Sequence, residues 1–296
     1  MRVILCLIIG VFFATSSTAQ SAKPTLDPAP DPQHPAAIAE LTIPSSGERM
    51  PALIYLANGP GLHPTFVLLH GFPGYEKNLD IAQELRRQGF NALFFHYRGA
   101  WGADGEYSIP QLDDDALAVL SFLRQPENAT KYRVDTSALS LLGHSLGGFT
   151  ALAVGTQDDA LVCVGAMSPV NMGVWKAGLA AKNTYSERLL PYADTLFMLR
   201  GFNAAAMSQQ LQGASMQEMD TRGFGPALRG KSIFMVVGDQ DPTTTPAAMF
   251  NPVVAEYEKV DGLELEHHII SGDHSFSWSR LAVTQLVVNW ANRDCR

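Results

Sequence analysis

The sequence is poor in cysteine and in basic residues, and both shortages narrow the range of functions. It has three cysteines in 296 residues, and lysine plus arginine number 21 against 29 aspartate plus glutamate, a formal net charge of −8. The basic residues do not gather in runs. An acidic chain without basic runs argues against nucleic acid or an anionic lipid surface as the partner.

Long apolar runs are missing beyond the first residues. Residues 3–14 are almost entirely apolar, follow the basic Arg2 and precede Ser17 and Ala19, two small residues placed for a cut before Gln20. This pattern predicts a secretory signal peptide over residues 1–19, so we expect an exported protein, periplasmic or secreted. The run is short for a bilayer, which makes a retained anchor the weaker alternative, and no later segment predicts an integral membrane span.

Proline is dense between residues 23 and 35 and predicts an extended, poorly packed lead-in over residues 20–37. The remainder, residues 38–296, is ample for a single large α/β domain. Loss of Cys6 with the signal peptide leaves Cys163 and Cys295, which are too few to form a metal site. An export compartment permits a disulfide between them, but the sequence cannot place them within bonding distance, so the pairing stays open.

Short apolar runs alternate with segments of helical period along the rest of the chain. Strands are expected at 40–43, 52–57, 66–69, 91–97, 139–142, 161–167, 233–237 and 263–270, with helices at 77–88, after Pro110, and at 149–154, 247–259 and 276–290. The alternation predicts an α/β fold with a mostly parallel sheet covered by helices on both faces. Reactive groups in such sheets gather at the carboxyl ends of the strands.

One segment, about residues 170–226, breaks the alternation because it contains no clear strand. It is rich in methionine and also holds Trp175. We interpret it as a helical cap inserted over the active-site end, whose adaptable methionines would suit a wall facing an apolar acyl group. The alternative is an ordinary packing layer in which methionine only fills space.

The pentapeptide Gly143-His144-Ser145-Leu146-Gly147 lies between an expected strand and an expected helix. A G-x-S-x-G pattern in this context is typical of a nucleophile elbow, a sharp turn that lifts the serine hydroxyl clear of the sheet. The new helix would also point its N-terminus at charge developing on the substrate. The alternative is a glycine-rich turn with a solvated serine.

A serine hydroxyl needs an adjacent base to act as a nucleophile at neutral pH. His274 is the best candidate, because it lies in a glycine-containing polar loop directly after an expected strand. His267 and His268 lie inside that strand and are expected to be structural. His144 is too close to Ser145 in sequence to act as its base, and is expected to help shape the elbow.

The base in turn needs an orienting acid, expected between Ser145 and His274 in sequence. Asp239 and Asp241 both follow the expected strand 233–237. We favour Asp241 as the acid, because it lies further beyond the end of the strand and is held there by Pro242. Asp239 is the alternative acid, and it can instead cap the turn.

The reaction also needs N–H donors for an oxyanion. The loop His70-Gly71-Phe72-Pro73-Gly74 follows the expected central strand. Because Pro73 has no N–H, the donor is Phe72 or Gly71. The second donor is expected at Leu146, directly after the nucleophile.

The chain resembles an α/β-hydrolase-fold serine hydrolase. The matching segments are residues 70–74, 143–148, 238–241 and 272–274, which occur in the order of that family and span nearly the whole folded chain. The resemblance implies a Ser-His-Asp triad, an acyl-enzyme mechanism and neither cofactor nor metal. Carried over by position, Ser145 is the nucleophile, Asp241 the acid and His274 the base, with Phe72 and Leu146 as amide donors.

Residues 97–102 and 105–108 resemble a loop of the esterase, dienelactone-hydrolase and peptidase-like branches of that family. In such relatives the region shapes the site, which makes Tyr75, Arg98 and Tyr107 candidate substrate contacts. A solvated surface loop is the alternative.

The sequence therefore predicts an exported serine hydrolase that cleaves a carboxylic ester or similar acyl bond of a small-molecule substrate. A peptidase or amidase acting on short peptides and an acyltransferase are the catalytic alternatives. An inactive binding module is a further alternative, and the three triad candidates count against it.

Overall fold

The computed structural model describes residues 26–296, apart from the side chains of 184–186. The predicted signal peptide and the first residues of the proline-rich lead-in lie outside the described residues. From residue 26 to residue 36 the chain has no helix or strand, and the first strand begins at Ala37.

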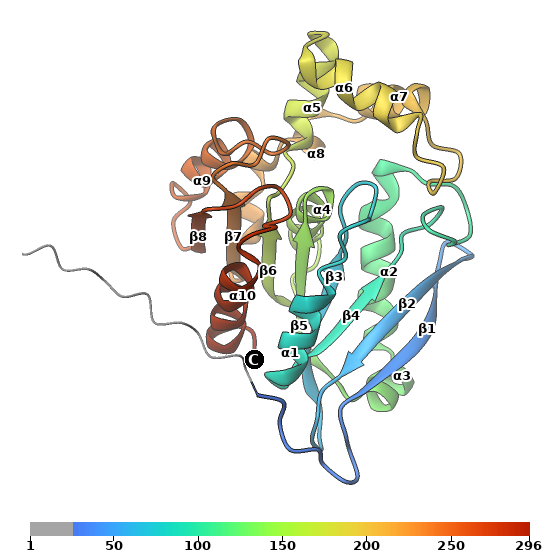
Figure 1. The fold of residues 1–296 in the computed structure, drawn as a ribbon, viewed down its shortest axis with the longest axis vertical. Coiled ribbons are helices and arrows are strands. Elements are labelled where there is room, and N and C mark those ends of the chain that lie inside the picture. The colour runs from blue at the N-terminus through green and yellow to red at the C-terminus, as the bar shows by residue number, and fades with distance from the viewer. Residues whose placement is uncertain (1–25) are drawn as a thin grey trace, which may run out of the picture.

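An eight-stranded sheet forms the centre of the structure, in the order β1-β2-β4-β3-β5-β6-β7-β8 (Figure 1). The strands are β1 (Ala37–Ser45), β2 (Glu48–Leu56), β3 (His63–Leu69), β4 (Asn91–Phe95), β5 (Val134–His144), β6 (Leu161–Met167), β7 (Ser232–Gly238) and β8 (Glu264–Ile270). Only β2 runs against its neighbours β1 and β4, and the pairs from β4 to β8 are parallel. The predicted mostly parallel sheet is confirmed.

The central strands β3 and β5 are neighbours, and their register brings two loops together. Leu69 at the end of β3 pairs with Gly143 near the end of β5. Strand β3 and residues 138–144 of β5 are almost wholly buried, as expected for short apolar runs covered on both faces. The loop after β3 and the turn after β5 therefore emerge side by side at the carboxyl edge of the sheet.

Helices cover both faces of this sheet. Alternate side chains of β3 point to opposite faces of the sheet and pack into two separate cores. Phe66 and Leu68 belong to one hydrophobic cluster, and Val67 and Leu69 belong to the other. On the Phe66 side the cover consists of α1 (Leu79–Arg87) and α10 (Arg280–Asp294). The other face is covered by α2 (Leu112–Arg124), α3 (Pro126–Tyr132), α4 (Leu146–Gly155) and α9 (Asn251–Tyr257).

The segment between β6 and β7 folds into helices that lie beyond the carboxyl edge of the sheet, coloured from yellow-green to orange in Figure 1. They are α5 (Met172–Ala180), α6 (Thr184–Ala193), α7 (Ala204–Gly213) and α8 (Met216–Met219). We call this group the cap helices. Met172, Met207 and Met219 are buried within this region. No methionine of residues 170–226 is among the residues that line the pocket at this edge of the sheet, so the expected methionine wall is wrong.

Two helices differ from their predicted bounds. The expected helix 247–259 is divided into a π-helical turn, Pro246–Phe250, and α9, because Pro252 has no N–H to continue the hydrogen-bond ladder. The last helix begins at Arg280 rather than at residue 276, because Phe276 is buried in the preceding loop with a φ of 56°. Among residues 26–296, no helix is long and apolar enough to cross a membrane.

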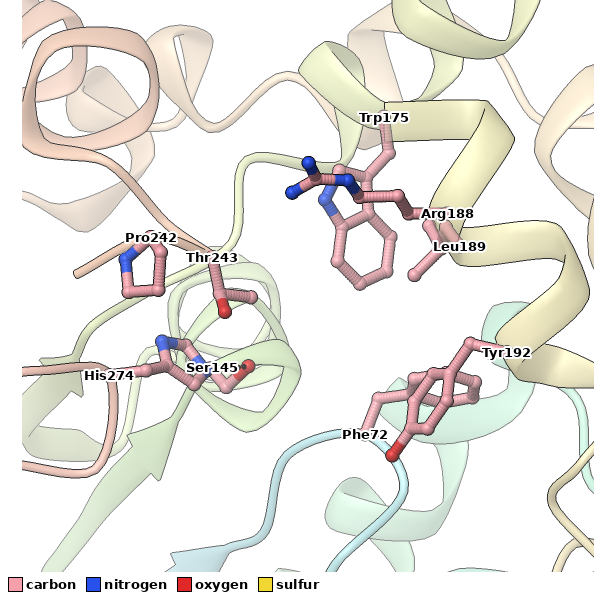
Figure 2. Close-up of a pocket in the computed structure, with 9 residues that line it drawn as sticks. All are labelled: Phe72, Ser145, Trp175, Arg188, Leu189, Tyr192, Pro242, Thr243 and His274. Carbon is pink, nitrogen blue, oxygen red and sulfur yellow. Dashed lines mark hydrogen bonds between the residues drawn. The ribbon is translucent and has the colours of Figure 1, made fainter. Parts of the chain in front are cut away.

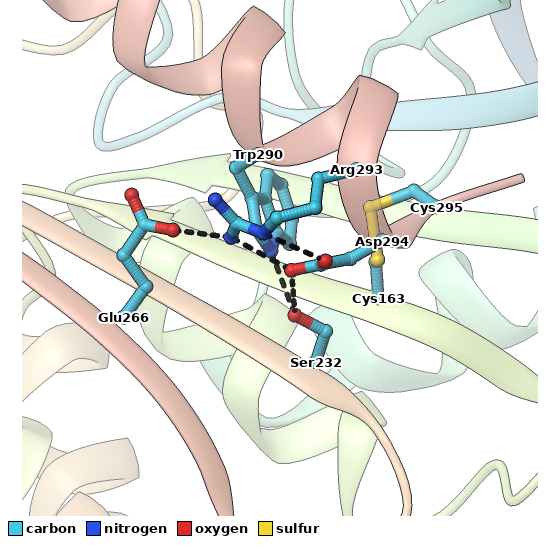
Figure 3. Close-up of a disulfide and its surroundings, with 7 residues drawn as sticks. All are labelled: Cys163, Ser232, Glu266, Trp290, Arg293, Asp294 and Cys295. Atoms are coloured by element: carbon cyan, nitrogen blue, oxygen red, sulfur yellow. Dashed lines mark hydrogen bonds and ion pairs between the residues drawn. A yellow bond between two sulfur atoms is a disulfide. The ribbon is translucent and has the colours of Figure 1, made fainter.

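Cys163 on β6 and Cys295 after α10 form a disulfide, with their Cα atoms 5.7 Å apart (Figure 3). The bond joins residues 132 positions apart and fixes the end of α10 against the sheet. Beside it, Trp290 Nε1 donates a hydrogen bond to Ser232 Oγ at 2.9 Å, and Ser232 Oγ donates to Asp294 at 2.8 Å. The pairing that the sequence left open is thus present in the structure.

Candidate active site

Ser145 occupies a strained turn between β5, which ends at His144, and α4, which begins at Leu146. Its φ of 59° lies in a region that non-glycine residues rarely adopt. A Cβ on Gly143 would lie 1.9 Å from the carbonyl oxygen of Gly147, so the turn excludes side chains there. The backbone is held from outside, since the N–H of Ser145 donates to Met167 at 2.9 Å.

Ser145, His274 and Asp241 form one chain of hydrogen bonds. His274 Nε2 lies 2.9 Å from Ser145 Oγ, and His274 Nδ1 lies 2.8 Å from Asp241 Oδ2. A carboxylate can only accept, so Nδ1 carries the proton and Nε2 is left to accept from the serine hydroxyl. The three residues come from the loops after β5, β7 and β8, which end at the same edge of the sheet.

Asp241 is buried and accepts hydrogen bonds from four donors. The N–H groups of Thr243 and Thr244 donate to Oδ1, each at 2.8 Å, and Thr244 Oγ1 and His274 donate to Oδ2. Burial disfavours the charge of this carboxylate, but His274 and Thr244 outweigh that effect and hold the pKa of Asp241 well below its usual value. Asp241 therefore stays ionised beside the imidazole.

Asp239 is not hydrogen-bonded to His274 and instead links two loops. Its Oδ1 accepts from the N–H of Gly272 at 3.0 Å, and its own N–H donates to Ile270 at 2.8 Å. These two bonds join the turn after β7 to the loop after β8. Of the two candidate aspartates, Asp241 is therefore hydrogen-bonded to His274, whereas Asp239 is bonded to the base of the loop after β8.

His144 supports the loop of His274 rather than Ser145 itself. Its Nε2 donates to the carbonyl oxygen of His274 at 2.7 Å, and its ring lies 4.8 Å from the His274 ring. Burial, together with the charge that His274 can carry, lowers the pKa of His144 to about 3. The side chain is thus a neutral donor at all but strongly acidic pH.

The loop after β3 approaches the elbow closely. A Cβ on Gly71 would lie 2.7 Å from the Cβ of Ser145. The N–H of Phe72 makes no hydrogen bond to any other residue within 26–296, and Leu146, as the first residue of α4, has no partner for its N–H inside the helix. His70 shapes this loop, because its Nδ1 donates to the carbonyl of Gly71 at 2.8 Å.

A pocket of about 630 Å³ lies above Ser145 and His274 (Figure 2). Its walls come from three places, namely the loop after β3, the loop after β7 and the cap helices. The remaining lining residues are Phe72, Trp175, Arg188, Leu189, Tyr192, Pro242 and Thr243. Phe72 and Tyr192 meet edge to face with ring centroids 6.1 Å apart, so the β3 loop and α6 close one side of the pocket. The cavity is of the size that takes a small molecule.

The three candidate substrate contacts do not line this pocket. Tyr107 is 2% exposed and packs behind Phe72, with ring centroids 6.3 Å apart. Arg98 is turned toward α2, where its N–H and guanidinium donate to the buried Asp115. Tyr75 is 62% exposed and packs against Trp101. The prediction of Arg98 and Tyr107 as contacts is wrong because both side chains are taken up by packing inside the fold.

Sequence reasoning missed the residues that the cap helices supply, namely Trp175, Arg188, Leu189 and Tyr192. Successive residues of a helix that covers a site face solvent, the core or the pocket. The hydrophobic periodicity of the sequence therefore cannot show which residues face the pocket. Trp175 was visible only as an aromatic residue within the expected cap. Within residues 26–296, no cluster of histidine, cysteine, aspartate and glutamate could hold a metal ion.

Comparisons with known proteins agree with this architecture. The chain is similar in structure to Est1E from Butyrivibrio proteoclasticus, with a TM-score of 0.64 and 20% identity over 86% of this chain and 98% of that one. It is also similar to the Pyrococcus furiosus esterase Pf2001, with a TM-score of 0.65 and 16% identity over 88% and 92%. These likenesses show the fold.

A sequence match is found in an uncharacterized 31.7 kDa protein of Escherichia coli from the traX-finO intergenic region. It is 30% identical over 107 residues, which are 34% of this chain and 36% of that protein. The chain therefore matches about a third of the length of this curated relative.

The doubly covered parallel sheet, with a serine at the turn after its central strand, defines a protein of the α/β-hydrolase fold. A sequence model of the alpha/beta hydrolase family matches residues 66–284. The chain therefore belongs to this family.

Proposed function

We propose that the protein is a serine hydrolase that cleaves a carboxylic ester through an acyl-enzyme intermediate. The observation that carries the proposal is the continuous chain from Ser145 Oγ through His274 to Asp241 at the floor of the pocket. The direction of both hydrogen bonds is the one that activation of a serine requires.

In the first half of the reaction, Ser145 Oγ forms a bond to the carbonyl carbon while its proton passes to Nε2 of His274. The negative oxygen of the tetrahedral intermediate accepts hydrogen bonds from the N–H groups of Phe72 and Leu146. The intermediate collapses with cleavage of the bond to the alcohol, which takes the proton from His274. The acyl group remains on the serine.

In the second half, water gives a proton to His274 and attacks the acyl carbon. Cleavage of the bond to Oγ releases the acid, and the proton returns to Ser145. Asp241 remains ionised throughout and stabilises the protonated imidazole. By the usual scale, each oxyanion donor lowers the barrier by about 3 kcal/mol.

We also propose that the protein is exported, to the periplasm or the medium. Two features support the proposal: the signal-peptide pattern over residues 1–19 and the disulfide between Cys163 and Cys295. Disulfides persist in oxidising compartments and are rare in a reducing cytosol. Expression with its own leader, followed by fractionation and N-terminal sequencing, would test the cut before Gln20.

The serine assignment is tested with a fluorophosphonate probe, which reacts covalently with an activated serine. The wild-type protein should label, and Ser145→Ala should not, with little change in its melting temperature. Ser168→Ala is a matched control, since Ser168 is also buried near the edge of the sheet but lies outside the hydrogen-bonded chain. Labelling of Ser145→Ala at the wild-type rate would exclude the proposed nucleophile.

The bond type is tested by comparing 4-nitrophenyl esters with aminoacyl 4-nitroanilides at the same acyl group. We expect turnover of the esters. A preference for the anilides would favour the peptidase or amidase alternative, and transfer to an added alcohol in place of water would favour the acyltransferase.

A further inference from the structure

Arg188 is the one charged side chain among the described residues that line the pocket, apart from His274 when it is protonated. It comes from α6, the same cap helix that supplies Leu189 and Tyr192. Figure 2 shows the guanidinium reaching from that helix toward the side of the pocket where Thr243 and Pro242 lie. A cation thus faces the space above Ser145.

This guanidinium makes no ion pair or hydrogen bond with any other described residue. Most other arginines are paired in the structure, for example Arg124 with Asp158 and Arg280 with Asp80. No acidic residue lines the pocket, and Asp241, the carboxylate of the site, is buried and already accepts four hydrogen bonds. Other described arginines, such as the exposed Arg229, also have no acidic partner. Arg188 differs from Arg229 because it lines the pocket.

Most of the remaining lining is apolar or aromatic, and the other polar residues are Ser145, Thr243 and His274. Phe72, Trp175 and Leu189 provide apolar surface against which a bound ligand can pack. Arg188 itself is exposed, so solvent partly screens its charge until a ligand covers it. A guanidinium presents a planar fork of donors that matches a carboxylate in two parallel hydrogen bonds.

We propose that the substrate is an ester that carries a carboxylate, which Arg188 binds while the serine attacks the ester carbonyl. This inference rests on the proposed function, because it names the substrate class of the same site. The carboxylate belongs either to the acyl group or to the alcohol, and both forms offer the same chemistry to the arginine. The aromatic wall packs against the part of the substrate between the two groups.

The test compares esters that differ only in this charge. For the acyl side, 4-nitrophenyl hydrogen glutarate is compared with 4-nitrophenyl pentanoate. For the alcohol side, 4-acetoxybenzoate is compared with its methyl ester. The quantity measured is the ratio of kcat/KM for the charged ester to kcat/KM for the neutral one, and the arm with the higher ratio shows which side carries the carboxylate.

We expect a wild-type ratio above one in at least one arm, and a fall of about tenfold or more in Arg188→Gln, the usual scale for one charge-assisted contact. Arg188→Lys should keep part of the preference, because it retains the charge but loses the fork. Arg229→Gln is the matched control: Arg229 is exposed, lies outside the pocket and changes the net charge equally. Its ratio should stay at the wild-type value. Added salt should lower the wild-type preference.

A wild-type ratio of one or less in both arms, or a ratio that Arg188→Gln leaves unchanged, would overturn the inference. These outcomes are distinct from a failure of the proposed function. If the neutral esters are cleaved and Ser145→Ala abolishes the cleavage, the serine hydrolase stands and only the substrate class is wrong. If no ester is cleaved and the serine does not label, the proposed function itself is wrong.

Discussion

The side chain of His144 holds the main chain of His274: its Nε2 donates to the carbonyl oxygen of His274 at 2.7 Å. The residue before the serine therefore fixes the loop that presents the imidazole to that serine. The ring is 3% exposed, so water cannot readily replace this bond.

His144→Leu removes the donor and leaves a buried carbonyl without a partner. We expect kcat to fall about tenfold, with a smaller change in KM, because the imidazole is no longer held at one distance from Ser145. The rate of fluorophosphonate labelling should fall by a similar factor. His144→Gln retains a donor and should recover part of the rate. Wild-type labelling by His144→Leu would show that the bond does not position the base.

Asp241→Asn should lower kcat by roughly 10⁴-fold, since an amide neither fixes the same imidazole tautomer nor stabilises its charged form. Asp239→Asn is the matched control, because its side-chain oxygen still accepts from the N–H of Gly272. That variant should lose at most a few-fold in kcat. Steady-state kinetics on a nitrophenyl ester separates the two, and a reversed order of effects would assign the acid to Asp239.

Stability should fall in mild acid because buried histidines must take up protons on unfolding. Burial lowers the pKa of His144 to about 3 and that of His70 to about 4, whereas both titrate near 6.5 in an unfolded chain. The unfolded chain therefore binds more protons below pH 6.5, and the free energy of unfolding decreases from there toward pH 4. The loss is roughly 3 kcal/mol for each histidine by pH 4.5.

Urea denaturation at pH 7.5, 6.0, 5.0 and 4.5 measures this loss. His267→Gln should leave the pH dependence unchanged, because His267 lies on the exposed side of β8. A free energy of unfolding that stays constant down to pH 4.5 would show that these histidines titrate normally in the folded protein.

The disulfide should stabilise the fold without affecting turnover. It closes a loop of 132 residues, for which chain entropy gives roughly 3 to 5 kcal/mol. Cys163 lies toward the amino end of β6, away from the carboxyl edge where Ser145 lies. The Cys163→Ala/Cys295→Ala variant should unfold at lower urea, keep the wild-type kcat in native buffer and no longer respond to reductant. Equal urea midpoints for the two proteins would contradict this role.

The parallel sheet and the order of its elements could be predicted because they follow from local pattern. A run such as Phe66–Leu69 is apolar on both faces wherever the strand lies, and the glycines around Ser145 leave the room that a tight turn requires. Predictions of where helices begin were less accurate. At Pro252 and Phe276 the boundary depends on one missing donor and one buried ring.

The pocket walls were much harder to predict. Tyr107 and Arg98 have side chains of the kind that often contact substrates. In the structure, however, Tyr107 packs behind Phe72 and Arg98 is paired with Asp115. Arg188 carries no signal in the sequence, because a helical arginine is normally a solvated surface residue. Its significance depends on which way α6 faces.

The sequence by itself determined the mostly parallel α/β sheet and predicted the class of chemistry, because a serine at a strand-to-helix turn, followed by an aspartate and a histidine after later strands, is a local and ordered pattern. Only the tertiary structure decided which aspartate meets His274, that Cys163 reaches Cys295, and which cap residues face the serine. Each of these depends on contacts between segments far apart in the chain, and such contacts are set by how the helices pack on the sheet rather than by the residues on either side of each position.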